Sequence, residues 1–169
     1  MSQCIHKLRI PVRLSRPAQE ALDGFLLLSP QEHDDDRLET ALDLLNSART
    51  VIPFISPSEG SVLLLMRANI DWVAVGSSVD TRLIYPPNRS VTREQRVELH
   101  FMDGSHIDGI IQWDDAENLK RLSDFLSWCD DFFVVVATSA TLIVNKQRIR
   151  ETRVAESTPR PAQVRVTAG

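Results

Sequence analysis

Residues 96–113 read RVELHFMDGSHIDGIIQW, and this stretch decides the fold. From Val97 to Phe101, apolar and polar residues alternate, which is the period of a strand with one buried face. Asp103-Gly104 follows, and this dipeptide is the strongest short signal for a hairpin turn. From Ile107 to Trp113, every second residue is apolar or glycine. The stretch therefore predicts a β-hairpin with one apolar face.

A helix and two further strands are expected after this hairpin. Asp114 and Glu117 fit a helix N-cap and its capping-box partner. An apolar stripe at helical spacing follows, formed by Leu119, Leu122, Phe125, Leu126 and Cys129. Residues 132–137 are β-branched and aromatic and predict a buried strand. Residues 142–144 and 149–154 complete a unit that runs strand, strand, helix, strand, strand.

An earlier part of the chain follows the same plan. Gly24 and Gly109 are 85 residues apart, and residues 22–26 lie over residues 107–111 at that offset. A strand-interior glycine marks a bend, a bulge or a close backbone approach, so we expect a valine at Gly109 to destabilise the fold. In this first unit, Asp36 can cap a helix with Glu39 at the box position, and its apolar stripe is Leu38, Ala41, Leu42 and Leu45.

The strands that follow this helix carry two further signals. Pro53 confines the strand at 51–55 to an edge or a bulge, because proline has no N–H to donate. The apolar run at 62–66 is typical of a strand that is buried on both faces. Each unit of about 60 residues is marginal alone, so two copies that cover each other's strand edges are expected.

We therefore expect an α+β fold of two tandem ββαββ units, packed as an intramolecular pseudo-dimer. The copies span residues 9–75 and 96–154, and a linker of turn residues spans 76–95. Leu83 to Tyr85 is a candidate for a short extra strand within that linker. Residues 1–8 are expected to be a flexible N-terminus and residues 155–169 a disordered tail.

The second copy also resembles a small, uncharacterised bacterial domain. The resemblance rests on the helix motif at 121–126 (RLSDFL), the Phe132-Phe133 strand, Val144-Asn145-Lys146 and Ile149. It implies a small, bent, β-rich sheet somewhat like an Sm-type barrel, and it implies no activity. The first copy departs from the pattern, with RLETAL at 37–42 and Met66-Arg67-Ala68 where Val-Asn-Lys would stand.

Composition narrows the function classes. The chain has 169 residues, 43% of them hydrophobic and 25% charged, which excludes a wholly disordered protein. Apolar runs are too short for a membrane span, and the N-terminus has no secretory h-region. Two cysteines do not make a disulfide framework, so the reducing cytoplasm is expected. A net charge of −4 argues against a dedicated nucleic-acid binder.

Catalytic and metal signals are weak. No phosphate-binding glycine motif and no nucleophile elbow occur, so we predict a protein that is not an enzyme and has no cofactor. The run His33 to Asp36 is interpreted as helix capping rather than as a metal site. His100 and His106 flank the Asp103-Gly104 turn and can face the same side of the hairpin. No further ligand has recognisable spacing, so we predict no metal site. Whether His100 and His106 bind a metal stays an open question at this point.

The basic residues give the one candidate surface. Outward positions on the sheet carry positive charge, while the helices carry acid; the candidate binding residues are Arg9, Arg13, Lys146, Arg148 and Arg150. Trp72 and Tyr85 are candidate interface anchors, with burial favoured for Trp72. The leading hypothesis is a non-enzymatic cytoplasmic adaptor or scaffold with a protein partner, present as a monomer or homodimer. The alternative is binding of nucleic acid or a small anion on the basic sheet face.

Overall fold

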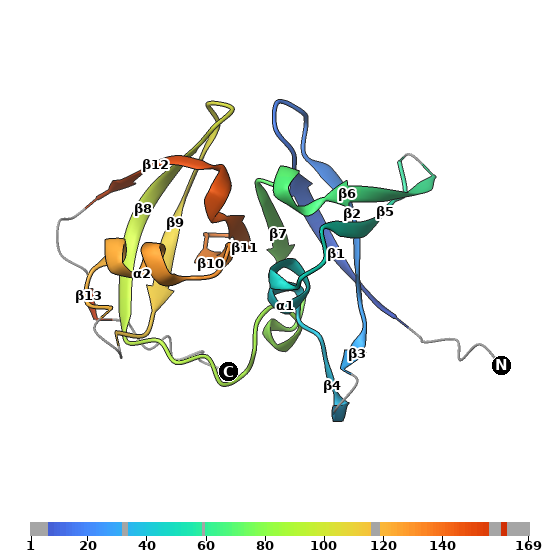
Figure 1. The fold of residues 1–169 in the computed structure, drawn as a ribbon, viewed down its shortest axis with the longest axis horizontal. Helices are drawn as coiled ribbons and strands as arrows, with labels where there is room; N and C mark the ends of the chain where they lie inside the picture. Colours follow the sequence, from blue (N-terminus) through green and yellow to red (C-terminus); the bar gives the residue numbers. More distant parts are fainter. Residues whose placement is uncertain (1–6, 32–33, 59, 116–118, 156–159, 162–169) are drawn as a thin grey trace.

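The computed structural model describes residues 7–31, 34–58, 60–115, 119–155 and 160–161 (Figure 1). We call residues 8–76 the first half. In chain order it contains β1 (Leu8–Ser15), β2 (Leu22–Leu28), β3 (Pro30–Gln31), β4 (Asp34–Leu38), α1 (Ala41–Asn46), β5 (Val51–Ser56), β6 (Ser61–Met66), the 3-10 turn η1 (Arg67–Asn69) and β7 (Trp72–Gly76).

The 3-10 turn η2 (Thr81–Leu83) leads to the second half, residues 93–154. It contains β8 (Arg93–Phe101), β9 (His106–Trp113), α2 (Leu122–Trp128), β10 (Phe132–Val136), β11 (Ala140–Asn145), the 3-10 turn η4 (Lys146–Arg148) and β12 (Ile149–Val154). A short strand, β13 (Arg160–Pro161), pairs with β8.

The two halves share one antiparallel sheet. Its strand order is β12-β8-β9-β10-β11-β7-β1-β2-β5-β6, with β13 beside β8, and β3 and β4 form a separate pair. The halves join where β7 pairs with β11 over five residue pairs, from Gly76 opposite Ala140 to Trp72 opposite Val144. In Figure 1 these two strands lie between the blue-to-green and the yellow-to-red parts of the ribbon.

Two hydrophobic cores lie on opposite sides of this junction. The first gathers β1, β2, α1, β5 and β7, and it also takes Phe132 and Ile143 from the second half. The other core gathers β8, β9, α2, β10 and β11, and Trp72 and Ala74 of β7 pack against it. Successive side chains of a strand point to opposite faces, so the junction strands serve both cores. The expected buried strand at 132–137 is confirmed, because residues 132–135 are all buried.

The expected α+β class and its two ββαββ units are wrong. The described part of the chain has only two α-helices, of six and seven residues, while strands form one long antiparallel sheet. Each half contributes five strands to that sheet, because the 3-10 turns η1 and η4 redirect the chain into β7 and β12. The protein is therefore β-rich.

Both helices begin later than the capping signals predict. Residues 34–38 pair as β4 instead of opening a helix, and Thr40 is the N-cap of α1 with Asp43 as its reciprocal partner. In α2 the N-cap is Arg121, and Asp124 is the residue at the third helical position whose carboxylate accepts from the backbone N–H of Arg121. The expected box residue Glu117 lies outside the described residues. An Asp followed three residues later by Glu is a local pattern that strand pairing can override.

The expected burial of the 62–66 run on both faces is also wrong. These residues form β6, the terminal strand of the sheet, and Val62, Leu64 and Met66 are exposed. Pro53 does not put β5 at an edge, since β5 lies between β2 and β6. Instead, the pairing of β5 with β2 covers only Ile55 and Phe54 and stops before the proline.

The segment between the halves packs on the first half. Leu83 to Tyr85 does not form the expected extra strand. Ile84 is buried in the first core, and its carbonyl accepts from the N–H of Leu42 at 2.9 Å. The expected flexible ends fall mostly on residues 1–6, 156–159 and 162–169, which lie outside the described residues, as does His33 of the acidic run.

The central hairpin agrees with its sequence signal. β8 and β9 pair over eight positions, from Arg93 opposite Trp113 to His100 opposite His106. Gly104 in the turn has a φ of +90°, which glycine adopts without strain. The predicted turn at Asp103-Gly104 is confirmed, and it sets which side chains of the two strands face each other.

Candidate functional site

The five predicted basic residues do not form one surface of free cations. Arg9 and Arg13 are exposed on β1, as their strand parity predicts. The side chain of Arg150 is 54% exposed and lies 3.9 Å from Glu151. Lys146 and Arg148, in η4, are half-buried and are engaged in contacts within the fold. Lys146 contacts the second half itself, and Arg148 contacts Asp71 of the first half.

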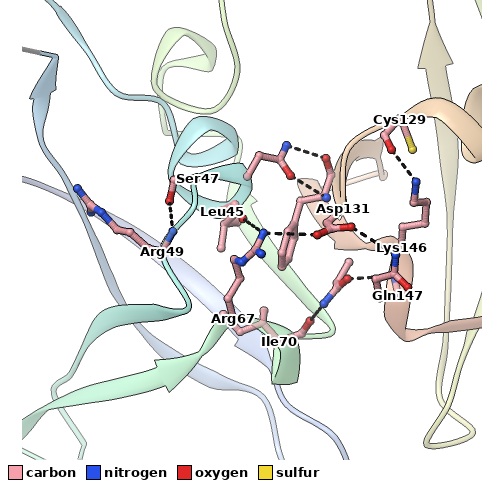
Figure 2. Close-up of polar contacts among 12 residues, drawn as sticks. Leu45, Ser47, Arg49, Arg67, Ile70, Cys129, Asp131, Lys146 and Gln147 are labelled. Atoms are coloured by element: carbon pink, nitrogen blue, oxygen red, sulfur yellow. Dashed lines mark hydrogen bonds and ion pairs between the residues drawn. The ribbon is translucent and has the colours of Figure 1, made fainter.

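Lys146 caps the end of α2. Its Nζ donates to the carbonyl of Cys129 at 2.6 Å, and its backbone N–H donates to the carbonyl of Asp131 at 2.6 Å (Figure 2). A cation at a helix C-terminus satisfies an orphan carbonyl and complements the helix dipole. The positive charge of Lys146 is therefore used within the fold.

Arg148 neutralises a buried acid. Its Nε lies 3.1 Å from Oδ1 of Asp71, whose side chain is fully buried between the halves, while Oδ2 has no hydrogen-bond partner. Burial raises the pKa of Asp71, and the Arg148 guanidinium opposes that rise. The sequence gives no signal for Asp71, because its significance depends on a burial that only the β7–β11 junction creates.

Two asparagines lock the junction. The Asn46 side chain donates from Nδ2 to the carbonyl of Phe132 at 3.0 Å, and its Oδ1 accepts from the N–H of Phe132 at 2.9 Å. Buried Asn145 donates from Nδ2 to the carbonyl of Ile70, also at 3.0 Å. Figure 2 shows this group of contacts between α1, η1 and the segment around Asp131. The polar cluster at the junction is thus structural.

The surroundings of Cys129 disfavour its thiolate form. Its thiol is half-buried at the end of α2, and burial raises its pKa to about 11. At neutral pH the thiolate, which is the reactive form, is scarce. The other cysteine, Cys4, lies outside the described residues.

The aromatic anchors that the sequence suggests are not exposed. Trp72 is half-buried against the second core. Tyr85 is half-buried, and the guanidinium of Arg89 lies over its ring at 5.2 Å from the centroid. The tryptophan that is exposed is Trp128 on α2, at 79%. The sequence pattern of the helix did not single out Trp128 as exposed.

The strongest unpartnered surface is the free edge of β6. Three side chains of one face are exposed: Val62 at 58%, Leu64 at 70% and Met66 at 51%. The strand SVLLLM carries no charge. Its backbone pairs only with β5 among the described strands, so its other side is open. Native sheets usually protect such an edge with charges, proline or a bulge.

The opposite edge of the sheet has that protection. β12 carries Arg150, Glu151 and Arg153, and a register shift between Ile149 and Glu151 makes its pairing with β8 irregular. The two edge strands of the sheet therefore differ: β12 is charged and irregular, while β6 is apolar and regular.

Two hollows open near the first half. One of about 960 Å³ lies over β1 and β2, lined among others by Arg13, Arg16, Glu20 and Asp23. Another of about 400 Å³ lies beside the end of β6, lined by Arg16, Pro17, Gln19, Leu64, Leu65, Met66, Asn69, Ile70 and Arg148. Arg16 lines both, and its Nε is buried without a hydrogen-bond partner. In the larger hollow, acids stand beside the arginines.

A cluster of ligand-type side chains lies on the β8–β9 hairpin. One ligand atom each of Glu98, His106 and Asp108 lies within 4.8 Å of the others. His100 stacks on His106 with ring centroids 5.3 Å apart, and its Nε2 hydrogen-bonds with Oε1 of Glu98. The His100 hydrogen bond lowers the pKa of Glu98. The sequence pattern points to the two histidines, while Glu98 and Asp108 join them only through the pairing of the two strands.

Comparison with known proteins adds no relative. No protein-family model, no curated protein and no solved structure matches the chain. Of the helices in the described ranges, none is long and apolar enough to cross a membrane.

Proposed function

We propose that this chain is a non-enzymatic protein-binding module, an adaptor or scaffold, that assembles through the free edge of β6. The partner at that edge is a second copy of the chain. The observation that carries the proposal is a regular, uncharged edge strand with three exposed apolar side chains in a sheet whose other edge is charged and irregular. The cysteine usage supports a reducing compartment, the cytoplasm.

The backbone of β6 is set up to accept another strand. Arg67 donates to the carbonyl of Thr50 at 2.9 Å, which continues the β5–β6 ladder by one pair. Hydrogen-bonded pairs alternate along an antiparallel ladder, so Leu65 and Leu63 bond to β5. The N–H and C=O groups of Val62, Leu64 and Met66 therefore point away from β5, toward the open side.

The sequence of β6 suits pairing with itself. In an antiparallel pair with its two-fold axis at Leu64, that residue lies opposite its own copy and Val62 lies opposite Met66 of the second copy. All three side chains share the exposed face, so every cross-strand pair on that face is apolar. No like charges meet, and two-fold dimers are the commonest symmetric assemblies.

The alternative, binding of nucleic acid or a small anion on a basic sheet face, has less support. Two of its five residues, Lys146 and Arg148, are used in contacts within the fold, with Cys129 and Asp71. The groove beside Arg13 also contains Glu20 and Asp23, which would repel an anion.

The test is a charge swap at the two-fold axis. By sedimentation velocity over a concentration series, we expect the wild type to form a dimer, and Leu64→Lys and Leu64→Glu each to be monomeric. Like charges then face each other at the centre of the interface. An equimolar mixture of the two variants should recover the dimer, because lysine then faces glutamate.

Trp128→Lys is the matched control, because it charges the most exposed apolar side chain on another element, and it should leave the dimer intact. A wild type that stays monomeric up to its solubility limit would refute the proposal. So would a dimer that Leu64→Lys does not weaken, or variants that fail to recover the dimer on mixing. Circular dichroism of each variant checks that it is folded.

A further inference from the structure

We propose that the β8–β9 hairpin holds a divalent transition-metal ion through Glu98, His106 and Asp108, with His100 positioning the Glu98 carboxylate. The inference is independent of assembly at β6, which lies in the other half of the chain. It rests on the register of the hairpin and on the chemistry of the four side chains.

Strand register brings these side chains to one face. Glu98 lies opposite Asp108, and His100 lies opposite His106, as successive same-face pairs of the ladder. The alternate positions, including Leu99 opposite Ile107, face the second core. Directly opposite residues have Cβ atoms about 4.5–5.5 Å apart, so imidazole and carboxylate groups from both strands reach a common point above the sheet.

The donor set suits a transition metal. Imidazole nitrogen and carboxylate oxygen together are typical ligands of Zn²⁺ and its first-row neighbours, whereas Ca²⁺ and Mg²⁺ prefer oxygen alone. Zn²⁺ lies about 2.0–2.2 Å from such ligands, so tetrahedral ligand atoms stand about 3.4 Å apart. The three ligand atoms here lie within 4.8 Å of one another, so rotations of exposed side chains close the difference.

Other contacts leave the ligands available. His106 and Asp108 are exposed, and no hydrogen bond or ion pair engages the Asp108 carboxylate among the described residues. His100, which is buried, holds the Glu98 carboxylate in place. Such outer hydrogen bonds orient metal-binding carboxylates in known sites.

The charged groups around the cluster come from β12. Arg153 lies 3.7 Å from Glu98, but its stronger contact, at 2.9 Å, is with Glu151. The Arg153 side chain is 65% exposed and can turn to solvent when a cation binds Glu98. Three protein ligands leave at least one position on the ion for water.

The corresponding hairpin of the first half is an internal comparison. Gly24 lies opposite Val12 in β1–β2 just as Gly109 lies opposite Val97 in β8–β9. One position further along, Arg13 faces Asp23 where Glu98 faces Asp108 in the second hairpin. Arginine is a cation and not a ligand, so this position of the first half offers no such site.

The experiment is a calorimetric titration of the tag-free full chain with ZnCl₂. We expect one saturable site in the wild type. His106→Ala and Asp108→Asn should each weaken it at least tenfold, since each removes a ligand. Both positions are exposed, so the variants should keep the wild-type melting temperature without zinc. With zinc, the wild type alone should melt at a higher temperature.

Two controls separate this site from other zinc ligands in the chain. Asp23→Asn makes the same change on the first hairpin and should leave zinc binding unchanged. His6→Ala/His33→Ala removes the other two histidines of the sequence and should also leave it unchanged. His100→Gln tests the positioning role: it should weaken zinc less than His106→Ala while the stoichiometry stays at one.

The proposal fails if zinc gives no saturable binding. It also fails if the His106→Ala/Asp108→Asn double variant binds zinc as the wild type does, or if the site is lost in the variant without His6 and His33. Co²⁺ in place of Zn²⁺ gives a second readout. With the wild type, its visible absorption bands should be those of Co²⁺ bound by nitrogen and oxygen ligands. With the double variant, these bands should be absent.

Discussion

At the scale of single residues, two glycines decide how closely the strands approach. A Cβ at Gly24 would lie 2.2 Å from the carbonyl oxygen of Ile55, and a Cβ at Gly109 would lie 2.4 Å from Cγ1 of Val135. Both distances are far below van der Waals contact. Strand β2 can therefore approach β5, and strand β9 can approach β10, this closely only because glycine has no side chain.

We expect Gly109→Ala to destabilise the protein by about 1–3 kcal/mol, because overpacking forces neighbouring atoms to move. Gly109→Val should cost more. Gly76→Ala is the matched control, since a Cβ there meets nothing within 4 Å. Urea denaturation measures both. A Gly109→Ala variant as stable as Gly76→Ala would show that the close approach is absent.

The two histidines of the central hairpin illustrate how far residue patterns reach. Their strand parity and the Asp103-Gly104 turn already place His100 and His106 on one side. Glu98 and Asp108 have that same parity, so the cluster could have been predicted by pairing the strands around the turn. Reading each strand alone missed it, because ligands from two strands meet only through their register.

At the scale of elements, the short helices depend on their caps and contacts more than on their own propensity. Helix α1 has six residues, which is too short to be stable alone. Buried Thr40 accepts from the N–H of Asp43 at 3.1 Å, and Asp43 accepts from the N–H of Thr40 at 3.1 Å. Ala41, Leu44 and Leu45 pack into the first core.

Thr40→Ala should therefore destabilise the protein by about 0.5–2 kcal/mol, the usual cost of losing an N-cap. Thr40→Ser keeps the hydroxyl and should recover most of that loss. Thermal and urea unfolding of the two variants are the measurements. Equal stability of the alanine and serine variants would mean that the hydroxyl contributes nothing.

Strand β6 and strand β10 show the limit of composition as a guide to burial. Both are continuous apolar runs, SVLLLM and FFVVV, and both fit a strand that is buried on two faces. β10 lies between β9 and β11 and is buried, while β6 ends the sheet and is half exposed. Neighbours that are distant in sequence make the difference, and a local pattern does not contain them.

At the scale of the whole molecule, two of the five predicted binding residues are used in contacts within the fold. Lys146 and Arg148 lie in η4, next to β11, and they contact Cys129 and Asp71. Asp71 is paired through one oxygen only. A buried carboxyl with an incomplete set of partners should leave a signature in the pH dependence of stability.

The sign follows from proton linkage. Because burial raises the pKa of Asp71, the folded state binds this proton more readily than the unfolded chain. Relative to Asp71→Asn, the wild type should therefore gain stability as the pH falls from neutral. The gain begins near the raised pKa and is complete below the ordinary value of 3.8.

Urea denaturation at a series of pH values from neutral to acid measures this difference. Asp130→Asn is the control with the same change of charge at an exposed position, and its stability should follow the wild type across the series. A wild type that loses stability relative to Asp71→Asn on acidification would contradict the assignment.

The sequence by itself determined the local features of this protein: the β8–β9 hairpin with its turn at Asp103-Gly104, the buried strand β10, and the glycine positions where strands approach closely. Each depends on the alternation of apolar residues in one strand or on the small size of one glycine. The local sequence contains both kinds of signal. The tertiary structure alone decided the sheet order, the exposure of β6 and the burial of Asp71. These depend on which strands lie side by side, and strand pairing is a contact between distant residues that no single stretch encodes.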